Sequence, residues 1–161
     1  MYSKTLLAVV LLSSSCFVAM AGVGKGDPFP GFTGKGIAGD VPDLSGKIVL
    51  VDFWASWCAP CKKSFPALER LAKSFGPRGF TIVAVSVDEE AEAMDGFLET
   101  HPVSFTVVRD AAQKLVAEAG VEAMPTSFLL GRDGKIAAVH LGFDSAKTEK
   151  ELTAEIERLL K

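Results

Sequence analysis

The chain has 161 residues, the length of one ordinary domain of roughly 100 to 200 residues. Its 48% hydrophobic and 23% charged residues suffice for a folded core and exclude a disordered chain. A formal net charge of -3 offers no attraction for phosphate backbones, so nucleic acid is not an expected partner. Three cysteines are too few for a disulfide scaffold, so any sulfur chemistry must be local.

The amino-terminal segment is typical of a secretory signal peptide. Lys4 precedes a short apolar run, and small residues lead to an Ala-x-Ala cleavage site that ends at Ala21. The strongly apolar part is much shorter than the ~20 residues that cross a bilayer. We expect residues 1–21 to be cleaved and residues 22–161 to form one exported domain. Two alternatives stay open: lipid attachment at Cys16, or an uncleaved segment that anchors the protein to the membrane.

The first half of the exported domain predicts a loop, a strand and a helix. Residues 22–46 are rich in Gly, Pro and Asp, which indicates a loop-rich lead-in with one short strand near Phe32. Residues 48–54 are a continuous apolar run, typical of a central strand covered on both faces. Apolar residues then recur at helical spacing as far as Phe75, which predicts a long amphipathic helix bent at Pro66.

The rest of the chain alternates between strands and helices. A second buried strand at 80–87 would complete a strand–helix–strand crossover, which makes parallel pairs. Asp133-Gly134 lies between two apolar runs and is a strong hairpin signal. We therefore expect an α/β fold with a central mixed sheet flanked by helices on both faces. The further elements expected are helices at about 91–100, 112–119 and 148–160 and strands at about 105–108, 126–130 and 135–141.

Cys58-Ala-Pro-Cys61 lies where the first strand meets the long helix. Free amide N–H groups at a helix amino end favour an anion and lower a thiol pKa from ~8.5 into a range of ~3.5 to 7.5. Cys61 follows one turn later on the same side and can attack the sulfur of Cys58. The alternatives are a stabilising disulfide or half of a zinc site, but His101 and His140 lack zinc-site spacing. The pattern favours a redox-active pair with no metal and no other cofactor.

Asp52 interrupts the first apolar strand. A carboxylate is costly to bury in its ionised form, so burial should raise the pKa of Asp52. Asp52 precedes Cys58 on the same strand-to-helix path and is placed to take the proton from Cys61 as that thiol attacks. An exposed Asp, or one satisfied by hydrogen bonds alone, is the alternative, and the bare pattern does not decide.

Aromatic residues surround the same junction. Phe53 and Trp54 lie within a strand and are expected in the core, whereas Trp57 lies in the turn and is expected to line the surface around Cys58. Pro125 precedes the strand at 126–130, where a proline is admissible.

The run from Val51 to Lys62, with Pro66, Met124-Pro125-Thr126 and Gly142 in this order, resembles the thioredoxin superfamily. Within it, the chain is most similar to the exported thiol-disulfide oxidoreductases of the TlpA and ResA type, over about residues 29–160. In two respects the chain departs from the patterns of the superfamily. Many TlpA-type sequences carry Asn where Asp52 stands, and apolar residues around Ala84 replace the lysine that accompanies the acid in cytosolic thioredoxins.

The resemblance implies a thioredoxin fold and a role for each site residue. It makes Cys58 the nucleophile, Cys61 the resolving thiol and Asp52 the buried acid. It also implies a cis Pro125 packed against the cysteine pair and a Met124 backbone that pairs with a bound polypeptide. The substrate-binding residues expected are Trp57, Met124, Pro125 and Thr126.

The function that the resemblance implies is reduction of disulfides in client proteins, such as apocytochrome c in cytochrome c maturation or a protein whose copper site is being assembled. A membrane thiol relay would return electrons to a periplasmic monomer. Two alternatives stay open. One is a disulfide donor or isomerase, and the other is a dithiol that binds Cu(I), with Met124 and His140 as assisting ligands.

Overall fold

The computed structural model describes residues 22–161, so the expected signal peptide and Cys16 lie outside it. It contains a five-stranded sheet in the order β3-β2-β1-β4-β5. The strands are β1 (Ile48–Trp54), β2 (Phe80–Ser86), β3 (Thr106–Arg109), β4 (Thr126–Leu130) and β5 (Ile136–Leu141). The helices are α1 (Ala59–Phe75), α2 (Ala91–Thr100), α3 (Lys114–Glu118) and α4 (Ser145–Leu159), with a short 3-10 turn η1 (Gly76–Arg78) after α1. None of the helices between residues 22 and 161 has the length and apolar character needed to cross a bilayer.

The sheet is mixed, as the sequence predicts. β1 runs parallel to β2, and β2 runs parallel to β3. β4 is antiparallel to both of its neighbours, β1 and β5, and the Asp133-Gly134 turn joins it to β5. Every residue of β1 is buried because this strand lies in the middle of the sheet, and this explains its unbroken apolar run.

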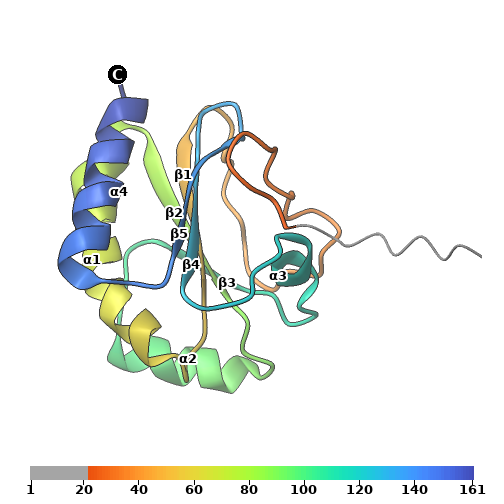
Figure 1. The fold of residues 1–161 in the computed structure, drawn as a ribbon. Helices are drawn as coiled ribbons and strands as arrows, with labels where there is room; N and C mark the ends of the chain where they lie inside the picture. Colours follow the sequence, from red (N-terminus) through yellow and green to blue (C-terminus); the bar gives the residue numbers. More distant parts are fainter. Residues whose placement is uncertain (1–21) are drawn as a thin grey trace, which may run out of the picture.

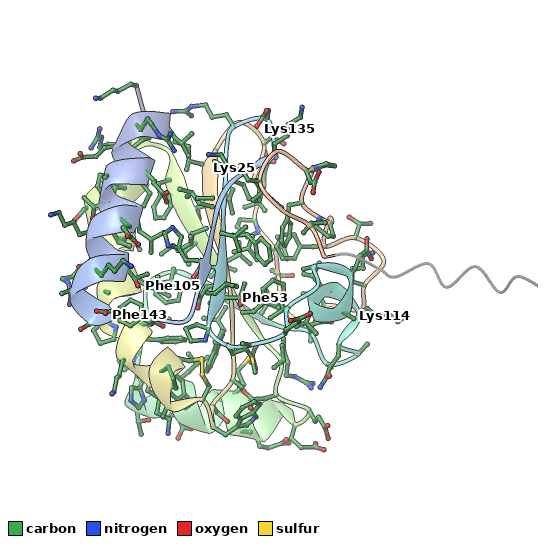
Figure 2. The ribbon with its side chains drawn as sticks, in the orientation of Figure 1. Lys25, Phe53, Phe105, Lys114, Lys135 and Phe143 are labelled. Atoms are coloured by element: carbon green, nitrogen blue, oxygen red, sulfur yellow. A yellow bond between two sulfur atoms is a disulfide. The ribbon has the colours of Figure 1, made fainter. Side chains whose placement is uncertain are left out.

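Two layers cover the sheet (Figure 1). α1 and α4 lie on one face, where Leu50 packs in a cluster with residues of both helices. α3 and the lead-in lie on the other face, where Phe53 packs 6.5 Å from Phe29, measured between ring centroids. Figure 2 shows Phe53 on this side of the strands. Successive residues of β1 thus face opposite layers, and the even-numbered ones, including Asp52, face α1 and α4.

The strand expected near Phe32 is absent from the described lead-in. Only isolated bridges occur there, one between Pro28 and Lys135 and one between Ala38 and Arg109. Gly34 and Gly36 have positive φ angles of 75° and 76°, so the backbone turns where a strand would extend. The aromatic side chains of this segment still reach the core, which is why its sequence resembled a strand.

Two helices begin away from their expected positions. α4 starts at Ser145, three residues earlier than expected. Asp144 precedes the helix, and its backbone N–H donates to the hydroxyl of Thr148 in the first turn at 3.0 Å. α3 starts two residues later, at Lys114, because both oxygens of the buried Asp110 carboxylate accept backbone N–H groups of its first turn.

Candidate active site

Cys58 and Cys61 form a disulfide at the amino end of α1. Cys58 is the N-cap residue, and its Sγ accepts the backbone N–H of Cys61 at 3.2 Å. Pro60 lies in the first turn, where its missing N–H costs no helical hydrogen bond. Cys58 is 5% exposed and Cys61 is 0% exposed, so only the first sulfur lies near the surface.

A buried carboxylate holds the turn that leads to Cys58. Asp88 follows β2, and its two oxygens accept hydrogen bonds from the Ser56 N–H at 3.0 and 3.2 Å and from the Ser56 hydroxyl at 2.9 Å. The Ser86 hydroxyl donates a further bond to Asp88 at 2.8 Å. Asp88 therefore ties the residue two positions before Cys58 to the end of β2.

Asp52 lies on the face of β1 that α1 covers. Its neighbours on the same face of β1 are Leu50, which packs with the middle of α1, and Trp54, whose ring lies 4.7 Å from that of Phe65. Asp52 is 1% exposed, and the Ser127 hydroxyl donates to its Oδ1 at 2.5 Å. Its Oδ2 is buried with no hydrogen-bond partner among residues 22–161.

Burial sets the ionisation of Asp52. Desolvation raises the pKa of Asp52 to about 7, although the hydrogen bond from Ser127 acts in the opposite direction. A carboxyl that titrates near neutral pH can both give and take a proton at that pH.

An open cavity of about 650 Å³ reaches Trp57, the residue directly before Cys58. Trp57, which is 69% exposed, and Met124 line it together. Most of the other lining residues are apolar, but the exposed Glu89, Glu90 and Glu122 add negative charge. The cavity therefore offers an apolar surface with an acidic edge.

The Met124–Pro125 peptide bond is cis, as the resemblance implies. Pro125 is buried, and its carbonyl accepts the N–H of Gly142 at 2.8 Å. The Thr126 side chain is 1% exposed and donates to the Ala123 carbonyl at 2.7 Å. Of the four expected substrate-binding residues, Trp57 and Met124 thus line the cavity, whereas Pro125 and Thr126 lie behind its wall.

The sequence analysis does not predict the contacts that Asp88 and Ser127 make at the site. A signal for Asp88 existed, because the carboxyl ends of parallel strands meet at one edge of a sheet and Asp88 follows β2 there. No sequence signal points to Ser127, since its contact with Asp52 depends on the register between β1 and β4.

Within residues 22–161, no three or more His, Cys, Asp or Glu side chains form a group able to hold a metal ion. Met124 and His140, the expected assistants of a Cu(I) dithiol, line different cavities. His140 instead pairs with Glu155 of α4, with Nε2 and Oε2 2.8 Å apart.

The chain matches the Redoxin family over residues 24–156. It is similar to the thiol-disulfide oxidoreductase ResA of Bacillus subtilis (strain 168), with 35% identity over 134 residues that cover 80% of this chain and 74% of ResA.

Solved structures show the same similarity to this chain. A Chlorobium tepidum protein assigned as the thiol:disulfide interchange protein DsbE is 37% identical with a TM-score of 0.79, covering 85% of this chain and 98% of that protein. StoA of Bacillus subtilis is 29% identical with a TM-score of 0.60, covering 70% of this chain and 85% of StoA. A Cys58–Cys61 disulfide at the start of a helix, on this fold and with these relatives, makes the chain a thioredoxin-fold thiol-disulfide oxidoreductase of the Redoxin family.

Proposed function

We propose that the protein is an exported reductase of disulfides in client proteins, with Cys58 as the attacking sulfur and Cys61 as the resolving sulfur. One observation carries this proposal. The outer sulfur, Cys58 Sγ, accepts an amide N–H at the amino end of α1, while the inner Cys61 is closed to any client. Such an environment favours a thiolate on Cys58 once the disulfide is reduced.

The first step is attack on a client disulfide. The Cys58 thiolate displaces one client sulfur, so the client S–S bond breaks and a Cys58–client disulfide forms. The displaced sulfur leaves as a thiolate and takes a proton from water. No electrons are lost in this step, because one disulfide has replaced another.

The second step releases the reduced client. The Cys61 thiol gives its proton to the ionised carboxylate of Asp52 and attacks Cys58 Sγ. The Cys58–Cys61 disulfide forms, and the second client sulfur leaves as a thiolate. The client has gained two electrons and the cysteine pair has lost two, which returns the protein to the oxidised form described here.

The cavity beside Trp57 is the client-binding surface in this proposal. The backbone of Met124 makes no turn or loop hydrogen bond within residues 22–161, so it can pair with an extended client segment. Trp57 offers an exposed aromatic contact next to the attacking sulfur. Pro125 and Thr126 are buried and do not line the cavity. In this proposal they fix the conformation of the loop that carries Met124.

Export and re-reduction complete the proposal. The signal-like residues 1–21 support export to the periplasm, where the mature domain 22–161 would act as a monomer. Each turnover oxidises the cysteine pair, so a membrane thiol relay must return two electrons. Apocytochrome c and proteins with copper sites under assembly are the proposed clients.

Two measurements test the reductase. We expect a reduction potential for the Cys58–Cys61 couple well below the ~-120 mV of a strong disulfide donor. A value near ~-120 mV would mean that the protein donates disulfides instead. A Cys61→Ser variant should trap mixed disulfides with client proteins in periplasmic extracts, and the matched Cys58→Ser variant should trap none. Equal trapping by both variants would contradict the assigned roles.

A further inference from the structure

Ser127 stands between Asp52 and His140 in one row across three strands. Asp52 of β1 is the register partner of Ser127 of β4, which is in turn the register partner of His140 of β5. Residues directly opposite each other in antiparallel strands place their side chains on the same face, with Cβ atoms ~4.5 to 5.5 Å apart. The three polar side chains therefore cross the sheet face that α1 and α4 cover.

The inner end of this row is buried, since Asp52 is 1% exposed. Ser127 supplies the only hydrogen bond to the Asp52 carboxyl among residues 22–161, and the other carboxyl oxygen has no partner there. Ala84 occupies the register position beside Asp52 on β2, so no cation approaches from that strand. The buried part of α1 adds no charged side chain, and its titratable group nearest the helix start is the Cys61 thiol of the reduced form.

The outer end of the row reaches solvent. His140 lines a cavity of about 300 Å³ whose other lining residues include Asp144, Lys147 and Glu151. Its Nε2 lies 2.8 Å from Glu155 Oε2, and its Nδ1 lies 3.9 Å from Glu151 Oε2. The ring of His140 therefore lies between two carboxylates of α4 and this cavity.

We propose that Ser127 and His140 are positioning residues that set the protonation state of Asp52 during the redox cycle. Ser127 does so by donating its hydroxyl hydrogen to the carboxylate, which favours the ionised form. His140 does so through charge, because an imidazolium at the next position of the row also favours an ionised Asp52.

The groups around His140 set the size of its effect. Glu155 and Glu151 of α4 and the nearby Asp144 oppose it, and Lys147 adds to it. The inference rests on the proposed role of Asp52 as the proton acceptor for Cys61.

The test is a direct titration of Asp52 in the reduced protein. Carbon-13 NMR of labelled aspartate carboxyls, followed from about pH 5 to about pH 9, gives the midpoint for Asp52. Ser127→Ala should raise this midpoint by about one pH unit, because a hydrogen bond to a charged group is lost. Ser127→Thr keeps the hydroxyl and should restore the original midpoint.

His140→Gln tests the outer end and remains informative if Ser127→Ala fails to fold. Glutamine can still donate to Glu155 but carries no charge, so the Asp52 midpoint should rise by a few tenths of a pH unit. The matched control is His101→Gln. His101 stacks on Phe97, away from the row, so its replacement should leave the midpoint unchanged.

Two results would overturn the inference. An unchanged Asp52 titration in Ser127→Ala would show that Ser127 does not set the protonation state of Asp52. An unchanged titration in His140→Gln would show the same for His140. The alkylation rate of Cys58, measured on the same samples, separates this failure from failure of the proposed function. Normal fast alkylation with an unchanged Asp52 titration rejects only the row, whereas slow alkylation of the wild type rejects the proposed nucleophile itself.

Discussion

Ser56 and Asp88 join the ends of two parallel strands directly before the active-site helix. The Ser56 N–H and hydroxyl both donate to the Asp88 carboxylate, at distances from 2.9 to 3.2 Å. Ser56 lies just beyond β1 and Asp88 just beyond β2, which pair in register along their whole length. The position of Cys58 therefore depends on a carboxylate 30 residues away in the sequence.

Asp88→Ala should destabilise the fold and slow the reaction of Cys58. The substitution leaves the Ser86 hydroxyl and the Ser56 N–H without their acceptor, at a cost of ~1 to 3 kcal/mol for a buried group. Urea unfolding of the oxidised protein measures the loss, and iodoacetamide alkylation of the reduced protein measures the reactivity. Asp95→Ala, at an exposed carboxylate of α2, is the control and should change neither value. Wild-type values for Asp88→Ala would show that the turn needs no such anchor.

Cys58 should ionise well below the pH of an ordinary thiol. In a reduced Cys61→Ser variant, the backbone N–H of residue 61 remains available to Cys58 Sγ. The alkylation rate should therefore reach half of its maximum at least one pH unit below ~8.5. The same variant in denaturant supplies the reference curve. Coincidence of the folded and denatured curves would contradict the proposed thiolate.

Much of the fold could be predicted from local patterns in the sequence. Residues 48–54 are apolar except for Asp52 because β1 is central. Asp133-Gly134 marks the hairpin because few residue pairs suit so tight a turn between antiparallel strands. The prediction of a strand near Phe32 is wrong because the aromatic side chains of this segment pack into the core from turns rather than from a strand. Apolar spacing alone does not distinguish these two cases.

The candidate site likewise has a part that the sequence predicts and a part that it does not. Cys58, Cys61 and Asp52 lie within ten consecutive residues, so their arrangement follows from one strand and one helix start. Ser127 and Asp88 act through contacts with residues 75 and 32 positions away in sequence. Such contacts depend on strand order and register, which a single sequence does not reveal. For the same reason the sequence does not decide whether the Asp52 carboxyl is buried, and in the structure it is.

Asp52→Asn should slow the resolution step but not the first attack. Asparagine cannot accept the Cys61 proton, and removal of a general base typically costs a factor of ~10² to 10⁴. Single-turnover kinetics with a peptide disulfide should show a mixed disulfide that accumulates and decays slowly. Alkylation of Cys58 on the same variant is the control, and we expect little change in it. Resolution at the wild-type rate would leave Asp52 with a packing role only.

The same variant should be more stable than the wild type at alkaline pH. Burial raises the pKa of Asp52 from 3.8 to about 7, so the folded state holds this proton more tightly than the unfolded state. The wild type therefore loses stability as the pH rises from 3.8 to about 7 and regains none above it. Asp52→Asn removes this loss, so its advantage should be absent near pH 3.8 and reach a few kcal/mol above pH 7.

Urea unfolding of the oxidised proteins at acid and alkaline pH measures this difference, since the disulfide-bonded cysteines do not titrate. Asp40→Asn, at an exposed position of the lead-in, is the control and should show no such pH dependence. A pH-independent stability difference for Asp52→Asn would mean that Asp52 titrates alike in both states.

The acidic edge of the cavity should favour clients with basic residues beside their disulfide. Glu89, Glu90 and Glu122 line the cavity together with Trp57, and all three are exposed. Replacing all three with Gln should lower kcat/KM for a lysine-flanked peptide disulfide about ten-fold at low salt, since each removed charge contributes ~0.5 kcal/mol at a solvent-exposed distance. An uncharged peptide should react at an unchanged rate, and salt should reduce the difference because it screens these charges. Glu157→Gln, on the exposed side of α4, is the matched control. Equal losses with the charged and uncharged peptides would show that the substitutions disturb the cysteine pair rather than client binding.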